Sequence, residues 1–227
     1  MKKTDTNILE ELFTAQAHLG HKTNRVHPKA EKYIYKVENA VSIIDLTQTA
    51  TLLEKAVNFL KEQAKEGKVL MVVSTKKVAA PIVNEYSKKH GIAFVTSKWP
   101  PGLLTNFQSL QHNIKKMLSM REARDNGEWE QLIKFEQSQL RKELSKLERV
   151  YGGLAAITKM PDILFIIDLK KEKNALIEAE KMAIPVVAIT DTNVNPNVAY
   201  PIPANDDAAS SVEYIVQKVL EAYSQGK

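Results

Sequence analysis

The chain has 227 residues, 44% hydrophobic and 26% charged, so it can bury one substantial core and is not a disordered protein. It has no cysteine, which excludes disulfides, thiolate zinc sites, iron–sulfur clusters and cysteine nucleophiles. The net charge of +5 is only mildly basic, and no segment approaches the ~18 apolar residues of a membrane span, so we expect a soluble, cytoplasmic protein without membrane contact.

Five short apolar runs predict buried β-strands. Their near-continuous hydrophobicity, rich in Val and Ile, is typical of strands that helices cover on both faces. In chain order the runs are residues 41–46, 68–75, 92–97, 162–169 and 184–190.

Segments of helical periodicity alternate with these strands. They are residues 47–67, 76–91, 171–183 and 209–224. Thr47 is expected to cap the first of them, and Gly67 and Gly91 to end the first two. Residues 205–207, Asn-Asp-Asp, are expected to cap the last helix rather than to bind metal. Strict alternation of strand and helix predicts a doubly wound, parallel α/β sheet.

Residues 105–150 interrupt the alternation because they contain no strand candidate. Their apolar residues have helical spacing, and turn-forming residues occur at 125–129. This pattern predicts an α-helical hairpin, a short antiparallel coiled coil. It is inserted into a discontinuous α/β domain made of residues 1–104 and 151–227. A hairpin this thin is expected to make contacts rather than to hold a catalytic pocket.

No catalytic motif is evident at the predicted ends of the strands. The loop that begins at Ser74 lacks the glycines of dinucleotide and P-loop sites, and no nucleophile elbow occurs. Asp191 and Asn193 follow the fifth run, where turn formation explains them. We therefore expect no enzyme activity and no cofactor. The alternative is a ligand-binding protein or enzyme that uses a strand-end crevice around Ser74, Thr75, Asp168 and Asp191.

Residues 18–29, HLGHKTNRVHPK, hold three of the five histidines. Gly20 and Pro28 disfavour a continuous helix, and no acid lies between His18 and Arg25, so a zinc site on the histidines is the weaker interpretation. Residues 20–36 carry five cationic side chains against one acid, which favours a surface for a polyanion. Cationic, Asn and His side chains with nearby Tyr33 and Tyr35 suit RNA.

Residues 97–107, SKWPPGLLTNF, follow the third strand and contain a second group of candidates. Trp99 either seals the loop on the core or contacts RNA. Lys115 and Lys116 lie on the first helix of the hairpin, where a solvated face is the ordinary explanation. The full set of residues expected to contact RNA is His21, Lys22, Asn24, Arg25, Lys29, Lys98, Trp99, Asn106, Lys115 and Lys116.

Taken together, the motifs resemble the bacterial-type ribosomal protein S2 family from about Ile8 to Tyr223. The resemblance rests on the segments AHLGHKTNRVHPK, VSIIDLTQT, KWPPGLLTNF, DILFIIDL, ITDTNVNP and YPIPANDD, in that order. The inserted hairpin favours the bacterial or organellar form.

This resemblance implies a flavodoxin-like α/β domain and a structural role in the small ribosomal subunit at the head–body junction. It implies small-subunit ribosomal RNA and neighbouring ribosomal proteins as partners, with no homo-oligomer. It also implies support for the docking of ribosomal protein S1 and hence for translation initiation.

The chain departs from the family pattern at three places. Val26 and His27 stand where relatives usually have tryptophan and asparagine. Ser74 stands where relatives usually have glycine. Pro100 and Pro101 replace two residues of a Trp-Leu-Gly-Gly segment and remove two backbone donors, which puts in doubt any contact made there by amides.

Overall fold

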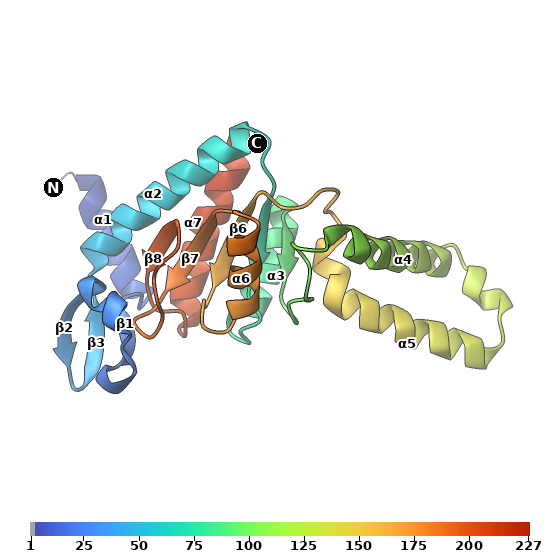
Figure 1. The fold of residues 1–227 in the computed structure, drawn as a ribbon, viewed down its shortest axis with the longest axis horizontal. Coiled ribbons are helices and arrows are strands. Elements are labelled where there is room, and N and C mark those ends of the chain that lie inside the picture. The colour runs from blue at the N-terminus through green and yellow to red at the C-terminus, as the bar shows by residue number, and fades with distance from the viewer. Residues whose placement is uncertain (1–2) are drawn as a thin grey trace.

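The computed structural model describes residues 3–227, with side chains described from residue 7 onward. At its centre is a five-stranded parallel sheet in the order β5-β4-β6-β7-β8 (Figure 1). The strands are β4 (Leu70–Val73), β5 (Ala93–Val95), β6 (Ile163–Ile167), β7 (Val186–Thr190) and β8 (Tyr200–Pro203). Because β4 pairs with both β5 and β6, the order is that of a flavodoxin-like, doubly wound sheet, which confirms the predicted fold class.

Helices cover both faces of this sheet. They are α2 (Leu46–Lys65), α3 (Ala79–His90), α6 (Lys173–Lys181) and α7 (Ala209–Gly226). Val72 and Phe165 point to the face covered by α2, α3 and α7, whereas their neighbours Val73 and Leu164 point to the face covered by α6 and residues 99–104. Every residue of β4, β6 and β7 is buried, which explains why these strands read as unbroken apolar runs.

The first predicted strand exists but does not belong to the parallel sheet. It is β3 (Val41–Ile44), the middle of an antiparallel sheet with β1 (Leu19–Lys22) and β2 (Ile34–Glu38). Its burial alternates, as in a strand covered on one face only. The fifth strand of the parallel sheet is instead β8, which carries two prolines and was not predicted. Proline is tolerated there because β8 lies at the sheet edge.

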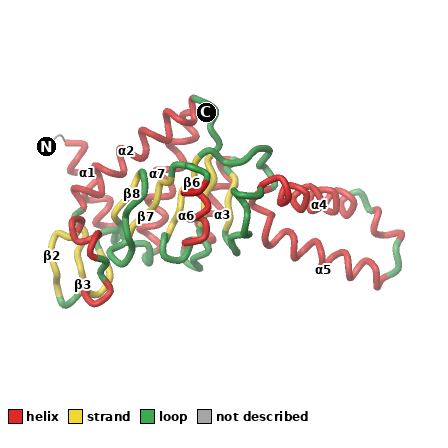
Figure 2. Tube along the Cα trace, viewed as in Figure 1, coloured by secondary structure: helices red, strands yellow, loops and turns green. Residues whose placement is uncertain are grey.

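The predicted helical hairpin is present between β5 and β6. It consists of α4 (Phe107–Asp125) and α5 (Lys134–Tyr151), joined through a short 3-10 helix at Glu128–Gln131, and it projects from the α/β body (Figures 1 and 2). Met117, Trp129 and Leu144 form a small core of its own. Its supercoiling as a coiled coil stays a prediction.

The helix ends follow local chemistry. Asp45, not Thr47, caps α2, since its carboxylate accepts a hydrogen bond from the Thr47 amide at 3.0 Å. Gly91 ends α3 in the left-handed conformation, as predicted. The expected side-chain cap on α7 is not formed: its N-cap is Ala208, which makes no side-chain cap bond. An additional helix, α1 (Lys3–Thr14), buries Leu12 in the core. None of the described helices combines the length and apolarity needed to cross a membrane.

Candidate functional site

The N-terminal segment predicted to bind a polyanion forms β1 and two 3-10 turns, Thr23–Arg25 and Pro28–Tyr33. It is anchored to the loop that follows β7, because the His27 amide donates to the Thr192 carbonyl at 2.8 Å. Its polar side chains Lys22, Asn24, Arg25 and Lys29 are exposed. Within the described residues Lys22, Arg25 and Lys29 form no ion pair, so their charge is presented to solvent.

Gly20 allows β1 to lie very close to β3 and to the loop that follows β7. A Cβ at Gly20 would lie 2.7 Å from the methyl carbon of Thr192 and 2.9 Å from the backbone oxygen of Ser42. We expect Gly20→Ala to lower the free energy of unfolding by about 1–3 kcal/mol, because β1 must move away from the body. Denaturant unfolding measures this. Gly152→Ala is the control, since a Cβ there meets nothing within 4 Å; an equal loss in both variants would contradict the explanation.

The three histidines of the segment do not meet at one point. His18 stacks on Phe13, with ring centroids 4.4 Å apart. His27 accepts a hydrogen bond from the Lys29 amide at 3.1 Å and so shapes the second 3-10 turn. Only His21 enters a cluster of carboxylates. The geometry therefore gives no site that uses all three imidazoles as zinc ligands.

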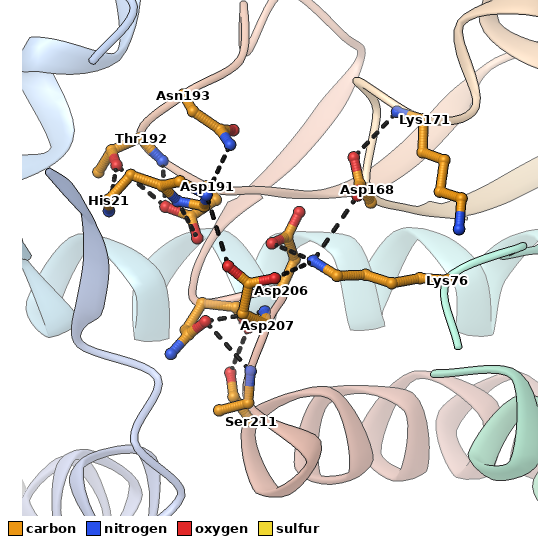
Figure 3. Close-up of polar contacts among 12 residues, drawn as sticks. His21, Lys76, Asp168, Lys171, Asp191, Thr192, Asn193, Asp206, Asp207 and Ser211 are labelled. Carbon is orange, nitrogen blue, oxygen red and sulfur yellow. Dashed lines mark hydrogen bonds and ion pairs between the residues drawn. The ribbon is translucent and has the colours of Figure 1, made fainter. Parts of the chain in front are cut away.

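His21 joins β1 to two acidic loops (Figure 3). Its Nδ1 lies 3.1 Å from a carboxylate oxygen of Asp191, and its Nε2 lies 3.4 Å from Asp207 and 2.8 Å from the side-chain amide of Asn193. The hydrogen bond and charge of Asp191, with the charges of Asp207 and Asp206, raise the pKa of His21 against the opposing effect of burial. Through these contacts His21 ties the small antiparallel sheet to the α/β body, and the neighbouring carboxylates favour its protonated form.

Lys76 is the other cationic centre of this cluster. Its ammonium group lies 2.7 Å from both Asp206 and Asp207 and 3.6 Å from Asp168 (Figure 3). Burial raises the pKa of Asp206, with help from the charges of Asp191 and Asp168, to about 7 even though Lys76 opposes the shift. Asp206 is only 2% exposed, so Lys76 compensates a charge that water cannot reach.

The same cluster contains the one arrangement of possible metal ligands found among the described residues. Ligand atoms of His21, Asp191 and Asp207 lie within 4.8 Å of one another, and the Asp191 oxygen nearest to His21 makes no polar contact with the described residues other than the one with this imidazole. Nitrogen and carboxylate oxygen suit a divalent cation such as zinc. Lys76 competes for the Asp207 carboxylate, so any such ion shares the site with a fixed positive charge.

The strand-end crevice of the alternative hypothesis is filled by the chain itself. In doubly wound sheets ligands bind where the strand order reverses, here between the ends of β4 and β6. The buried carboxylate of Glu172 occupies this position and accepts hydrogen bonds at 2.6 Å from both the amide and the hydroxyl of Thr75. The Lys171 ammonium group also contacts this loop and donates a hydrogen bond to the Thr75 carbonyl at 2.7 Å. The donors that a ligand phosphate would need are therefore already engaged.

Trp99 lies inside the protein. Its side chain is 6% exposed, and its indole N–H donates to Glu178 at 2.9 Å. Of the two interpretations from the sequence, this position favours the sealing of the loop. Glu178, from α6, was not identified from the sequence as important, yet its two oxygens also accept the amides of Gly102, Leu104 and Thr105. One carboxylate thus organises the entire loop before α4.

The remaining candidates lie on other surfaces. Lys98 and Asn106 are exposed at the two ends of the loop organised by Glu178. Lys115 and Lys116 are exposed on α4, where Lys116 pairs with Glu143 of α5 at 2.6 Å. The structure therefore groups His21, Lys22, Asn24, Arg25 and Lys29 at one end of the molecule and sets the hairpin lysines apart from them, at its other end (Figure 1).

Comparison with known proteins gives one consistent result. A family model described as "Ribosomal protein S2" matches residues 12–226. The "Small ribosomal subunit protein uS2" of Dictyoglomus thermophilum is 43% identical over 221 residues, covering 97% of this chain and 90% of the relative. Proteins of the same name from Dehalococcoides mccartyi and Microcystis aeruginosa are 40% and 39% identical, covering 96% of this chain in each case and 89% and 83% of the relatives.

Proposed function

The chain belongs to the ribosomal protein S2 family, and from this premise we propose that it is a structural, RNA-binding constituent of the small ribosomal subunit. Proteins of this family are structural and are not enzymes. The self-filled crevice at Glu172 and Thr75 agrees with such a role, because it leaves no preformed pocket at the usual ligand position.

The observation that carries the proposal is the separation of charge at the N-terminal segment. Lys22, Arg25 and Lys29 are exposed and unpaired within the described residues, whereas Asp191 and Asp206 beside them are buried and compensated internally. The segment therefore presents cations outward on a rigid support. Such a surface suits phosphate groups of RNA, which lysine and arginine bind without reading a base sequence.

Finer features follow from the resemblance of the motifs to the family. We propose a position at the junction of head and body, contact with small-subunit ribosomal RNA and neighbouring proteins, support for docking of ribosomal protein S1, and a cytoplasmic location as part of the ribosome. We also propose that residues 105–150 act as an extension of the domain formed by residues 1–104 and 151–227. Lys98, Asn106, Lys115 and Lys116 are exposed and belong to the proposed RNA contacts, whereas the buried Trp99 supports the loop beneath them.

Charge removal tests the proposal. In the triple variant Lys22→Ala, Arg25→Ala and Lys29→Ala, we expect weaker co-sedimentation with small subunits as salt is raised. For wild type, log affinity should fall linearly with log salt, and the variant should lose about 0.7–0.9 of slope per phosphate contact removed.

A matched control removes three exposed lysines at the opposite side of the fold: Lys65→Ala, Lys88→Ala and Lys89→Ala, at the C-terminal ends of α2 and α3. This control should sediment like wild type. If the N-terminal variant sediments as well as wild type at elevated salt, the segment has no part in binding; if wild type itself does not bind small subunits, the proposed function is wrong.

A further inference from the structure

Several loops meet at one edge of the parallel sheet. Because all five strands run in the same direction, the loops after β4, β6, β7 and β8 leave at their carboxyl ends, on the same side. Three further exposed lysines lie at this edge, one in the loop after β4, one in the loop after β6 and one at the first residue of α6, and their ammonium groups make no hydrogen bond or ion pair within the described residues. The expectations from the sequence did not include them. These are Lys77, Lys170 and Lys173, and we call them the lysine rim.

The lysine rim is held in place by contacts between the two loops that carry it. Lys171, beside Lys170, donates to the Thr75 carbonyl at 2.7 Å, and Glu172, beside Lys173, accepts the Thr75 amide. Asp168 begins the β6 loop with φ of +71° and accepts the Lys171 amide at 3.0 Å, which fixes a tight turn. The rim therefore lies on ordered backbone, and little conformational entropy of the loops is lost when a partner binds.

A continuous series of contacts connects the lysine rim to the N-terminal segment. Lys76, next to Lys77, binds Asp207, and Asp207 binds His21, which precedes Lys22 in the chain (Figure 3). The two groups of cations thus border the same acidic cluster from two sides.

The acidic residues at this edge of the sheet do not neutralise the positive charge of the lysine rim. Asp206 is buried and bound to Lys76, and Asp207 lies between Lys76 and His21. Glu172 is buried against Thr75. None of the three rim lysines has an ion-pair partner among the described residues. Asp206 and Glu172 are thus held inside the fold, and Asp207, although its side chain is 61% exposed, is shared by two cations, whereas the rim lysines face outward.

We propose that the lysine rim is a second RNA-phosphate contact surface, which extends the one formed by Lys22, Arg25 and Lys29 along the carboxyl edge of the sheet. The inference rests on the proposed function and assigns it a further face of the molecule. Separate lysines on neighbouring loops suit a polyanion with regularly spaced charges. A single bound phosphate would need converging amide donors, and here the Thr75 amide is taken by Glu172.

The test uses the full-length chain and RNA extracted from small ribosomal subunits. The variant Lys77→Ala, Lys170→Ala and Lys173→Ala leaves Lys171 in place, because Lys171 supports the loop. We expect the slope of log affinity against log salt to fall by about 2 relative to wild type, with unchanged thermal unfolding. The control Lys65→Ala, Lys88→Ala and Lys89→Ala should keep the wild-type slope. A rim variant with the wild-type slope, or equal losses in both variants, overturns the inference while leaving the proposed function intact.

Lysine acetylation of intact small subunits gives a second readout. Mass spectrometry should find the rim lysines protected and Lys65, Lys88 and Lys89 modified. The protection should disappear after ribonuclease digestion. Rim lysines that are modified as readily as the controls contradict the contact, and protection that survives digestion assigns the surface to a protein partner and overturns the RNA assignment.

Discussion

Replacing Glu178 with glutamine is expected to lower the free energy of unfolding by about 2–4 kcal/mol. The carboxylate accepts hydrogen bonds from the Trp99 indole and from the amides of Gly102, Leu104 and Thr105. Glutamine keeps one acceptor oxygen but turns an NH₂ group toward other donors, which then lose their partner. The desolvation penalty of a buried donor without a partner is larger than the net contribution of an average hydrogen bond to the free energy of unfolding.

The same substitution should change the pH dependence of stability. Burial acts to raise the pKa of the Glu178 carboxyl, but the hydrogen bonds from Trp99 and the three amides outweigh it and hold the pKa below its ordinary value. A group with a depressed folded pKa contributes stability that is present above its unfolded pKa and is lost as pH falls through the folded pKa. The deficit of Glu178→Gln should therefore be full at neutral pH and shrink below about pH 4.5.

Denaturant unfolding of Glu178→Gln and of Glu180→Gln provides the measurement. Glu180 lies on the same helix and is exposed, so its substitution should change stability by less than about 0.5 kcal/mol. Tryptophan fluorescence should also report a wetter environment for Trp99. Equal stabilities of the two variants would show that the loop does not depend on this carboxylate.

The elements that the sequence predicted well are those whose signal is local. The runs that became β4, β6 and β7 are almost entirely apolar because helices cover both faces, and each half of the hairpin has apolar residues at helical spacing, with turn-forming residues between the halves. Strand β8 was missed because Pro201 and Pro203 argue against a strand unless its edge position is known. The turn between β2 and β3 was missed because Asn39 and Ala40 both adopt positive φ, where glycine is the usual signal.

In the candidate site, too, features with a local sequence signal were predicted, and features that depend on residues far apart in the chain were not. Exposure of Lys22, Arg25 and Lys29 follows from a locally basic, polar segment and was predicted. The acidic cluster was not, because His21 and Asp191 are 170 positions apart and no local pattern pairs them. Asp191 was interpreted as a turn residue, and the Asn-Asp-Asp segment as a helix cap. In the fold only its Asn205 supports the turn before α7, by accepting the amides of Asp207 and Ala208.

Replacing Lys76 with methionine is expected to lower the free energy of unfolding by about 1–3 kcal/mol at pH 8. Lys76 is the cation closest to Asp206, which is 2% exposed, and it also binds Asp207 and Asp168. Methionine keeps much of the volume, but Asp206 must then either carry a buried charge without compensation or take up a proton and lose its ion pair. Lys77→Met, one residue away and exposed, is the control and should change stability by less than about 0.5 kcal/mol.

The pH dependence separates this electrostatic cause from lost packing. Asp206 has a folded pKa of about 7 against an ordinary value of 3.8, so the ionised form is disfavoured in the fold, and its effect on stability becomes more adverse as pH rises from about 4 to 7. The raised pKa of His21 acts in the same direction, since the stability it contributes is present below its unfolded pKa and is lost as pH rises through its folded pKa.

Lys76 favours the ionised form of Asp206, so its removal makes ionisation of Asp206 less favourable still. The deficit of Lys76→Met should therefore shrink by about 1 kcal/mol or more when denaturant unfolding is repeated at pH 5 instead of pH 8, because protonation of Asp206 removes the uncompensated charge. A deficit that is the same at both pH values would assign the loss to packing alone. It would also mean that Lys76 does not hold the acidic cluster together, and that Asp207 and His21 keep the N-terminal segment in place without it.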